Sequence, residues 1–479
     1  MSNTHKIPHE KIVHQKLADT QMRENVSSAM HTLQNNRGKV IESKFEDWQG
    51  LRAKAKQAKN NALMNLPERL LEFEKNATKN GMQVHWADSD TDACEIIYQL
   101  MLEKNISKIL KGKSMASEEV GLNHYLEGKG LQAIETDLGE LIIQLNHEAP
   151  VHIVVPAIHK NRYEIGEIFK DKLNAPLESE PEKLNAIARV HLRNQFEGLQ
   201  MGLSGANFAM SREGAVWLIE NEGNGRMCTT APDIHVIICG IEKVLESFED
   251  AATMVCLLTP SATGQFIPTY NNIITGPRKD ELDGPKEVHI VLFNHHRSDM
   301  LASKNYYEAL RCIRCGTCMN FCPVYDKIGG HAYQAVYPGP IGEVISPNLF
   351  GIDEAGDILS FCSLCGRCSE VCPVEIPLAD LIRTLRGNKV GQGEDLPLNS
   401  NKLHHSATEA FIFKQFQKMA TSGDLWRFAI SKAHRFNGVL QSLKGVLPVV
   451  KKWSAYKDLP QIKLDLHKEV QKIEGVRYE

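Results

Sequence analysis

The chain has 479 residues, which exceeds the usual size of one domain and predicts two or three folding units. With 42% hydrophobic and 24% charged residues, its composition is that of a globular protein and excludes a disordered or fibrous chain. The net charge of −4 and the lack of a basic stripe with regularly spaced aromatics argue against a nucleic-acid partner. No apolar run reaches the roughly 18–20 residues of a membrane span, and residues 1–16 lack the apolar core of a secretory signal, so we expect a cytoplasmic protein.

The first part of the chain, residues 1–70, is rich in Lys, Glu, Gln, Asn and Ala. Its apolar residues recur at helical spacing, as Leu66, Leu70 and Leu71 do. This pattern predicts two or three amphipathic helices, which would form either a docking arm or a collar packed on the domain that follows.

Residues 71–297 alternate short β-rich runs with helical stretches, which is typical of an α/β domain with a mainly parallel sheet. The predicted strands are 83–86, 108–110, 131–136, 152–157, 234–239 and 288–293. Helices are predicted near 92–104, 117–128 and 163–173. Two further runs joined by a turn predict an added hairpin of strands 208–210 and 215–219.

Several polar or glycine-rich strings lie in this α/β region, and none of them is a P-loop or a dinucleotide-binding fingerprint. They are 111–119, 135–140, 156–160, 202–207 and 221–226. The glycine-rich strings suit an anion site at the start of a helix, and they suit ordinary turns equally well. Glu135, Asp137 and Glu140 follow a predicted strand, where α/β folds bind ligands, but an acidic group without a paired base does not by itself indicate acid–base catalysis. No catalytic residue is assigned.

The cysteines are strongly clustered, since eight of the twelve fall in two runs after residue 298. Each run has the form C-x2-C-x2-C-x3-C-P, and the two runs share a glycine after the second cysteine and a valine after the proline, which indicates an internal duplication. In a reducing cytosol such clustering indicates metal or redox chemistry rather than disulfides. The other four cysteines stand singly among apolar residues and are expected in the core: Cys94, Cys228, Cys239 and Cys256.

Three cysteines at intervals of three residues wind a loop around one [4Fe–4S] cubane, so that three thiolates reach three irons and the fourth cysteine points away. In two-cluster ferredoxins that fourth cysteine binds the other cluster. The first cluster is therefore expected on Cys312, Cys315, Cys318 and Cys372. The second cluster is expected on Cys362, Cys365, Cys368 and Cys322.

Two zinc sites are the alternative, and they fit less well because zinc usually takes its four ligands as two separated C-x2-C pairs. Gly316 and Gly366 are expected to let the backbone approach the clusters closely. Arg311, Arg314 and Arg367 flank the thiolates, where they either offset the anionic charge of the clusters or are simply exposed on the surface.

Helical lead-ins at 300–311 and 353–361 precede the two cysteine runs, and a Gly/Pro-rich connection at 329–351 separates them. The cluster domain is expected to span 298–392 and a basic helical region 393–479. Residues 401–479 hold 14 Lys/Arg against 7 Asp/Glu. Such a tail either contacts an anionic membrane surface or a partner, or forms a solvated helical face over a small core.

Six strings, KGKSMASEE, ETDLGE, PAIHK, GLSGAN, NEGNGR and HVIICGIEKV, precede the twin cysteine motifs and the basic tail. In this order they resemble the bacterial lactate utilization protein B family of iron–sulfur proteins (LutB/LldF type), over nearly the whole chain. The resemblance implies a LUD-type α/β domain, similar to the NagB and CoA-transferase fold, followed by a helical ferredoxin-like domain with two [4Fe–4S] clusters. It also implies a system that oxidises L-lactate to pyruvate, with a cysteine-rich-domain subunit and a small LUD-domain subunit as partners.

The chain is therefore expected to be an electron-transfer subunit that passes single electrons from lactate through its two clusters. Because the sequence offers no recognisable flavin or nicotinamide site, lactate would be oxidised at a site in, or shared with, a partner. The alternative is that the α/β domain is an enzyme for a phosphorylated or CoA-linked substrate, with the clusters as structure or redox sensor.

Overall fold

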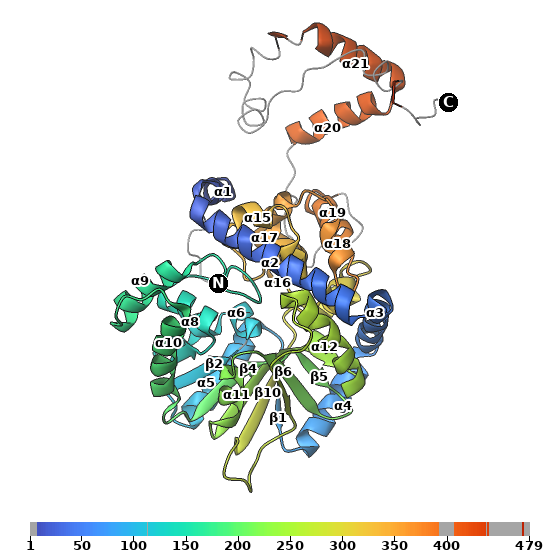
Figure 1. Ribbon diagram of the computed structural model, residues 1–479. Helices are drawn as coiled ribbons and strands as arrows, with labels where there is room; N and C mark the ends of the chain where they lie inside the picture. The colour runs from blue at the N-terminus through green and yellow to red at the C-terminus, as the bar shows by residue number, and fades with distance from the viewer. Residues whose placement is uncertain (1–6, 113, 392–406, 437, 440–471, 474–479) are drawn as a thin grey trace. The chain divides into compact units, whose positions relative to one another are not determined.

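The computed structural model describes residues 7–112, 114–391, 407–436, 438–439 and 472–473. The chain falls into two compact units, Met1–Leu403 and His404–Glu479, and each is described by itself (Figure 1). Within the described part of the chain, no helix is long and apolar enough to cross a membrane.

Four helices open the first unit, where two or three were predicted. They are α1 (His9–Ala18), α2 (Thr20–Lys44), α3 (Trp48–Met64) and α4 (Leu66–Lys79). The side chains of Asp19 and Asp47 cap α2 and α3 by accepting from main-chain N–H groups of the first turn. Helix α2 packs on α12 (Phe248–Thr263) of the α/β domain and on α15 (Tyr325–Ile328) beside the cysteine motifs, so these helices form a collar (Figure 1).

The α/β domain is built on a six-stranded parallel sheet with the strand order β1-β10-β7-β4-β2-β3. The strands are β1 (Gln83–Ala87), β2 (Lys108–Gly112), β3 (Gln132–Glu135), β4 (Met201–Gly205), β7 (Ile234–Gly240) and β10 (Glu287–Phe293). Strands β4 and β7 are buried along their whole length, as expected for a parallel sheet that is covered on both faces. Because the strands are parallel, their carboxyl ends meet at one edge of the sheet.

A second, smaller sheet has the order β8-β5-β6-β9. Its strands are β5 (Phe208–Met210), β6 (Ala215–Glu220), β8 (Val244–Leu245) and β9 (Tyr270–Ile274). The predicted hairpin is confirmed, since β5 and β6 pair antiparallel with Phe208 opposite Trp217. The helices between the strands are α5 (Asp90–Glu103), α6 (Met115–Glu119), α7 (Leu122–Gly128), α8 (Leu138–Leu145), α9 (Arg162–Leu173), α10 (Pro181–Phe196) and α11 (Asn224–Thr230).

The prediction of a strand at 152–157 is wrong, because these residues form an irregular loop. Its apolar side chains Ile153, Val154 and Val155 pack against the cysteine region instead of filling a sheet. The string 202–207 also differs from the prediction, since most of it is the buried strand β4. A Cβ on Gly202 would lie 2.0 Å from a main-chain oxygen of α11, so glycine is needed for the close packing of that helix on the sheet.

The cysteine region follows the sheet directly. It contains α13 (Arg297–Ala302), α14 (Thr317–Asn320), α15, α16 (Gly339–Phe350), α17 (Ile352–Ala355), α18 (Arg367–Val371) and α19 (Leu378–Lys389). The two predicted lead-ins contain 3₁₀ helices, η2 (Tyr306–Arg311) and η4 (Gly356–Phe361). The Gly/Pro-rich stretch 329–351 is more than a connection, since it holds η3 (His331–Tyr333) and the almost fully buried helix α16.

One apolar core joins these parts of the first unit. It includes Val26 of α2, Phe208 of the small sheet, Leu257 of α12 and Val344 of α16, all of them at most 1% exposed. The same core contains six of the eight clustered cysteines. The cysteine region is therefore packed as an extension of the α/β domain rather than as a separate lobe.

The isolated cysteines follow the prediction with one exception. Cys94, Cys228 and Cys239 are buried, whereas Cys256 is exposed. Cys256 lies on α12, whose amphipathic pattern buries residues such as Met254 and Leu257 and leaves this position on the outer face. Apolar neighbours in the sequence therefore do not predict burial for a residue on the outer face of a helix.

The second unit contains α20 (Ala407–Ala420) and α21 (Gly423–Arg435), which agrees with the helical prediction for the described part of this region. The rest of 393–479 lies outside the described residues. Phe416 and Trp426 make an edge-to-face contact with ring centroids 6.2 Å apart, and both remain partly exposed.

Burial of His235 in the sheet makes the fold sensitive to acid. The ring lies on β7 with Nε2 at 2.8 Å from Oγ of Ser204, and in the described part of the chain its Nδ1 has no hydrogen-bond partner. Burial, followed by the charge of His289, lowers the pKa of His235 to about 3. Since an unfolded histidine titrates near 6.5, the unfolded chain binds more protons than the folded chain between about pH 6.5 and 3, and the free energy of unfolding falls as the pH falls through that range.

We predict that His235→Gln reduces this acid sensitivity, because glutamine can still bond to Ser204 but cannot be protonated. Between pH 7.5 and 5, the wild-type chain should lose about 2 kcal/mol more stability than the variant. Anaerobic urea unfolding at the two pH values measures the difference. The same loss in both proteins would show that His235 does not carry this effect.

Candidate functional site

The two cysteine motifs have the same local backbone. Arg314 and Leu364, at equivalent positions, both have left-handed φ angles, 60° and 56°. Their main-chain N–H groups donate to Sγ of Cys312 and Cys362 at 3.4 and 3.3 Å. The duplication in the sequence is therefore also a duplication of structure.

The motif glycines continue this symmetry but differ in what surrounds them. Gly316 and Gly366 have φ angles of 75° and 80°, which glycine adopts without strain, and each opens a short helix. A Cβ on Gly316 would lie 2.8 Å from Cε1 of His152, whereas a Cβ on Gly366 would meet nothing within 4 Å. At this glycine, only the first motif is packed closely against the α/β domain.

Four thiols from both motifs line one small cavity: Cys312, Cys315, Cys318 and Cys372. The rest of the lining is mostly apolar and includes Ile153, Ile341 and Ile376. Burial raises the pKa of Cys315 to about 11 and that of Cys372 to about 12. Thiols so placed give up their protons only to a cationic centre, and this donor set fits an iron–sulfur cluster.

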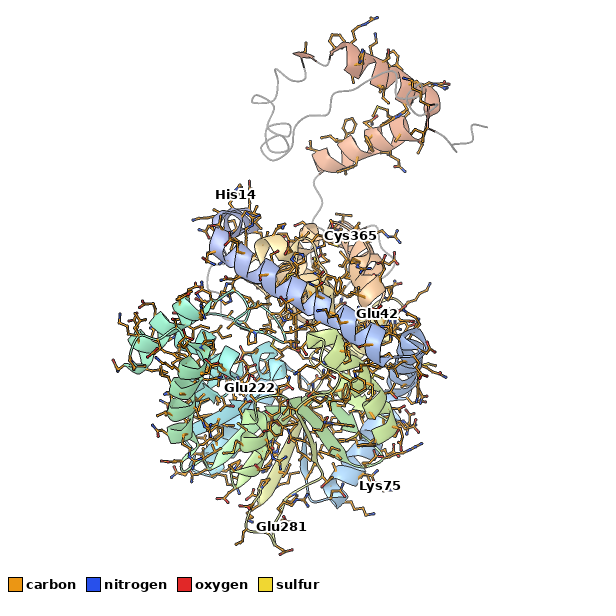
Figure 2. The ribbon with its side chains drawn as sticks, viewed as in Figure 1. His14, Glu42, Lys75, Glu222, Glu281 and Cys365 are labelled. Atoms are coloured by element: carbon orange, nitrogen blue, oxygen red, sulfur yellow. The ribbon has the colours of Figure 1, made fainter. Side chains whose placement is uncertain are left out.

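The other four thiols form a neighbouring set around Cys368. Burial, followed by the charges of Cys362, Cys322 and Cys365, raises the pKa of Cys368 to about 12. Cys365 is exposed and Cys362 is half-buried, so this set opens to solvent (Figure 2). Charges of both sets act on Cys318, which places the two sets next to each other.

Arginines from the collar and from α19 hold the backbone of the motifs. Arg52 of α3 donates to the carbonyl oxygen of Cys372 from Nε at 3.1 Å and from Nη2 at 2.7 Å. Arg386 of α19 donates to the carbonyl oxygen of Cys362 at 2.5 Å. The contacts of Arg52 tie the collar to the cysteine region, and that of Arg386 holds the second motif to α19.

The three arginines that flank the thiolates have different environments. Arg311 is 1% exposed and donates to the carbonyl oxygen of Glu375 at 2.9 Å. Arg367 is on the surface, where its side chain is 52% exposed and pairs with Glu370. The side chain of Arg314 is 13% exposed and enters a second, larger cavity. Of the three arginines, only Arg367 is simply exposed on the surface.

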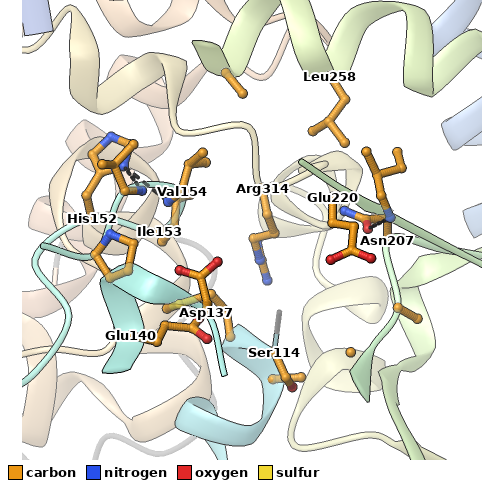
Figure 3. Close-up of a pocket in the computed structure, with 18 of the residues that line it drawn as sticks. Ser114, Asp137, Glu140, His152, Ile153, Val154, Asn207, Glu220, Leu258 and Arg314 are labelled. Atoms are coloured by element: carbon orange, nitrogen blue, oxygen red, sulfur yellow. Dashed lines mark hydrogen bonds between the residues drawn. The ribbon is translucent and has the colours of Figure 1, made fainter. Parts of the chain in front are cut away.

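This larger cavity, of about 340 Å³, lies at the carboxyl edge of the parallel sheet (Figure 3). Residues at or just after the ends of five strands line it: Ser114, Asp137, Gly205, Gly240 and Phe293. This edge is where α/β sheets bind ligands.

All of the polar and glycine-rich strings noted in the sequence contribute lining residues to the larger cavity. Of the acidic residues after β3, Asp137 and Glu140 line the cavity. Glu135 instead forms a buried ion pair with Lys111, at 2.6 Å.

The loop at 152–157 forms the wall between the two cavities, and Ile153 lines both of them. Nδ1 of His152 accepts from the N–H groups of Val154 and Val155 at 3.1 Å, so Nε2 carries the proton and donates to Oδ1 of Asn320 at 3.1 Å. Burial lowers the pKa of His152 to about 4. His152 is therefore neutral at pH 7 and shapes the wall rather than accepting protons.

A buried ion-pair network joins this sheet edge to the first motif. Arg297 of α13 binds Glu119 of α6 through two contacts of 2.8 Å and Glu242 through one of 2.5 Å. Arg314 of the motif lies 3.4 Å from the other oxygen of Glu242 and packs 4.7 Å from the ring centre of Tyr337. The side chain of Arg314 is thus held at the cavity, while the main-chain N–H of the same residue donates to Sγ of Cys312.

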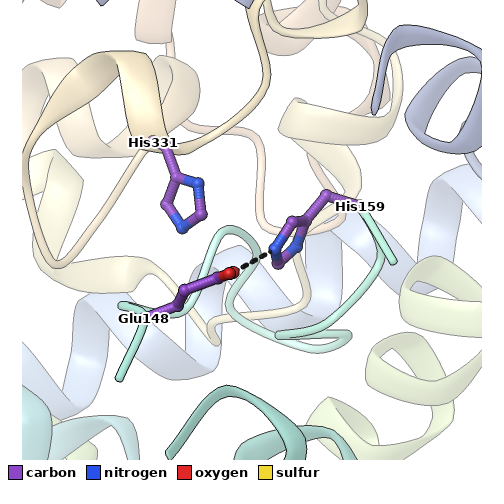
Figure 4. A group of neighbouring side chains, drawn as sticks. All are labelled: Glu148, His159 and His331. Carbon is purple, nitrogen blue, oxygen red and sulfur yellow. Dashed lines mark hydrogen bonds and ion pairs between the residues drawn. The ribbon is translucent and has the colours of Figure 1, made fainter. Parts of the chain in front are cut away.

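A third group of side chains also joins the two parts of this unit (Figure 4). Glu148 lies 2.6 Å from Nε2 of His159 and 2.7 Å from Nζ of Lys160, while His331 of η3 donates to the carbonyl oxygen of Ala149 at 2.9 Å. Although Glu148, His159 and His331 lie close enough to hold a metal ion, these pairings account for the group without one.

Comparison with known proteins gives three successive family matches. They are "LUD domain" at residues 70–293, "4Fe-4S dicluster domain" at 308–376 and "Lactate utilisation protein B, C-terminal" at 384–476. The uncharacterized electron transport protein YkgF of Escherichia coli (strain K12) is 38% identical over 453 residues, which cover 94% of this chain and 93% of that protein. Lactate utilization protein B of Bacillus subtilis (strain 168) is 37% identical over 445 residues, or 92% of this chain and 90% of that one.

A mostly parallel α/β domain followed by twin cysteine motifs, with a matching dicluster family, defines an iron–sulfur protein with two [4Fe–4S] clusters. The zinc alternative is thereby set aside. The chain belongs to the lactate utilization protein B family, and the resemblance seen in the sequence is confirmed.

We predict that Gly316→Ala damages the first motif more than Gly366→Ala damages the second. Both changes put a side chain at a left-handed residue, which costs about 1–2 kcal/mol. Only Gly316→Ala also drives a Cβ to 2.8 Å from His152. Iron content after anaerobic purification and the thermal unfolding midpoint measure the effect. Equal losses in the two variants would show that the contact with His152 does not confine the first motif.

Proposed function

We propose that this protein is the iron–sulfur electron-transfer component of a system that oxidises L-lactate to pyruvate. The observation that carries the proposal is the asymmetry of the two thiol sets, one buried beside a cavity of the α/β domain and one open to solvent at Cys365. The names of the relatives, lactate utilization protein B and electron transport protein YkgF, support the same function.

The proposed ligands of the first cluster are Cys312, Cys315, Cys318 and Cys372. Those of the second are Cys362, Cys365, Cys368 and Cys322. The shared cavity supports the first set, because it combines three thiols of one motif with the last thiol of the other. The charge of Cys322 at Cys368 supports the second.

When bound, such clusters supply one-electron transfer. The residues around the first thiol set keep water out, since Ile153, Ile341 and Ile376 line its cavity. Around the second set the loop of Leu364 and Cys365 is exposed, which leaves room for an electron acceptor to approach. We therefore assign electron entry to the buried set and exit to the exposed set.

Oxidation of lactate to pyruvate releases two electrons and two protons. Because each cluster accepts one electron at a time, the reaction needs a group that can accept two electrons. No motif for a flavin or nicotinamide is present in this sequence, so that step is assigned to a site in or shared with a partner. The proposed partners are a cysteine-rich-domain subunit and a small LUD-domain subunit, and the protein would work in the cytoplasm.

The finer architecture is also part of the proposal. Residues 71–297 would share the NagB and CoA-transferase fold, which the parallel sheet and its edge cavity support. Residues 298–392 would form a helical ferredoxin-like domain, between the helical region 1–70 and the basic region 393–479. The exposed aromatics Phe411, Phe413 and Phe428 of the basic region support peripheral contact with an anionic membrane.

The rival function, an enzyme for a phosphorylated or CoA-linked substrate, is favoured by the size and place of the larger cavity. The acidic side chains in the lining disfavour it: Asp137, Glu140, Glu220 and Glu222. A polyanionic substrate would meet these carboxylates, so electron transfer remains the better account.

Crossed ligation is tested by four serine variants compared under reducing conditions. Cys322→Ser should give the same paramagnetic resonance spectrum as Cys365→Ser, because both remove a ligand of the second cluster. Cys372→Ser should likewise match Cys315→Ser. The wild-type protein should hold about eight irons per chain, the sum of two four-iron clusters. A Cys322→Ser spectrum that matches Cys315→Ser would refute the crossing.

Lactate should reduce the clusters only when the partner subunits are present. The isolated chain carries one-electron centres and no recognisable two-electron acceptor, so we expect no bleaching of cluster absorbance by lactate alone within minutes. Adding both partners should start the bleaching and saturate at a fixed ratio. Rapid reduction of the isolated, flavin-free chain would instead place lactate oxidation within this subunit.

A further inference from the structure

We propose that the larger cavity binds a small monocarboxylate with an oxygen on the adjacent carbon, and that Arg314 and Lys243 hold its carboxylate next to the first thiol set. This inference rests on the proposed function, because lactate and pyruvate are a 2-hydroxy and a 2-oxo acid.

Three cations line the cavity, and two of them, Arg314 and Lys243, are available to a ligand. The third, Arg297, is already paired with Glu119 and Glu242. Arg314 makes one long ion pair of 3.4 Å with Glu242, and among the described residues its guanidinium has no other hydrogen bond. Lys243 also lines the cavity, and its ammonium has no hydrogen bond or ion pair to any described residue. Both can therefore bind an anion without giving up a strong partner.

Lys243 and Arg314 line the same cavity, where two positive charges favour an anion. Burial, and then the charge of Arg314, lower the pKa of Lys243. A carboxylate would relieve this repulsion, and the planar guanidinium matches both of its oxygens.

Acidic groups in the lining favour a ligand with a single negative charge over a more highly charged one. Figure 3 shows the Arg314 side chain reaching between Asp137 and Glu140 on one side and Glu220 on the other. Phosphate dianions would be repelled there, whereas a hydroxyl group can donate to a carboxylate, whose oxygens accept more than one hydrogen bond. A 2-hydroxy acid offers both features, one carboxylate and one adjacent donor.

Arg314 belongs to the first motif, so an anion bound to its guanidinium would affect the first cluster electrostatically. Its N–H donates to Sγ of Cys312, while its guanidinium lines the cavity. An anion bound there offsets a positive charge beside the first cluster, so adding an electron to that cluster becomes less favourable. By reciprocity, reduction of the first cluster weakens binding of the anion. In the second motif, Leu364 takes the equivalent position and is 39% exposed, so no such coupling is expected.

Binding is tested on the anaerobic holoprotein with pyruvate, which carries no electrons to donate to the clusters. Calorimetric titration should show saturable binding of pyruvate and of L-lactate, and much weaker binding of inorganic phosphate. Arg314→Leu and Lys243→Met should each weaken pyruvate binding on the order of tenfold to a hundredfold, the usual effect of losing a charged hydrogen bond. Arg367→Leu is the matched control, because it removes an exposed arginine of the second motif that does not line the cavity, and pyruvate should bind it as tightly as wild type.

A redox titration supplies a second readout that a purely structural role would not move. Pyruvate should lower the reduction potential of the first cluster, leave that of the second unchanged and have no effect in Arg314→Leu. Iron content and both resonance signals show that each variant is folded. The proposal is overturned if pyruvate does not bind the wild type, binds Arg314→Leu equally well, or binds less tightly than phosphate. If binding fails while partner-driven reduction by lactate persists, the site is wrong and the proposed function stands.

Discussion

The structure depends on one constraint, which is that the cavity of the first thiol set takes cysteines from both motifs. Cys372 reaches the thiols of Cys312, Cys315 and Cys318 only if the second motif folds back on the first. The intervening chain must then be compact, and the buried helix α16 fills that space. Because the carbonyl oxygen of Cys372 is held by Arg52, the collar is tied to the same arrangement. The shared core of collar, small sheet and cysteine region follows from this requirement.

The duplicated motifs share a backbone conformation and differ in their surroundings. Positions 314 and 364 share a left-handed φ and the same contact with a thiol sulfur. Yet the arginine of the first motif enters a cavity at the sheet edge, and the leucine of the second is exposed. Under the proposed function, this difference would let the first centre respond to a ligand in the larger cavity and leave the second open to an external acceptor.

Spacing and alternation were enough to predict the cysteine motifs, most strands of the parallel sheet and the hairpin. They failed where distant packing decided the structure. The run at 152–157 is apolar like a strand, but its side chains pack, half-buried, against the core that contains the cysteine region, which no local pattern can indicate. Strand β4 was missed because its glycines, needed for close packing of α11, resemble a loop. Each string around the larger cavity is conspicuous in the sequence by itself, but that they meet at one cavity depends on the parallel order of the strands.

The ion pairs between the sheet edge and the first motif are better understood as positioning devices than as a source of stability. Burying Glu119, Arg297 and Glu242 carries a desolvation cost that their attraction offsets only with good geometry, and similar pairs in proteins add little net stability. Their geometry is nevertheless restrictive, since Arg297 binds both oxygens of Glu119 and one of Glu242. The second oxygen of Glu242 is left for Arg314, at 3.4 Å. The network therefore fixes the position of Arg314 relative to the strand ends, between the first motif and the larger cavity.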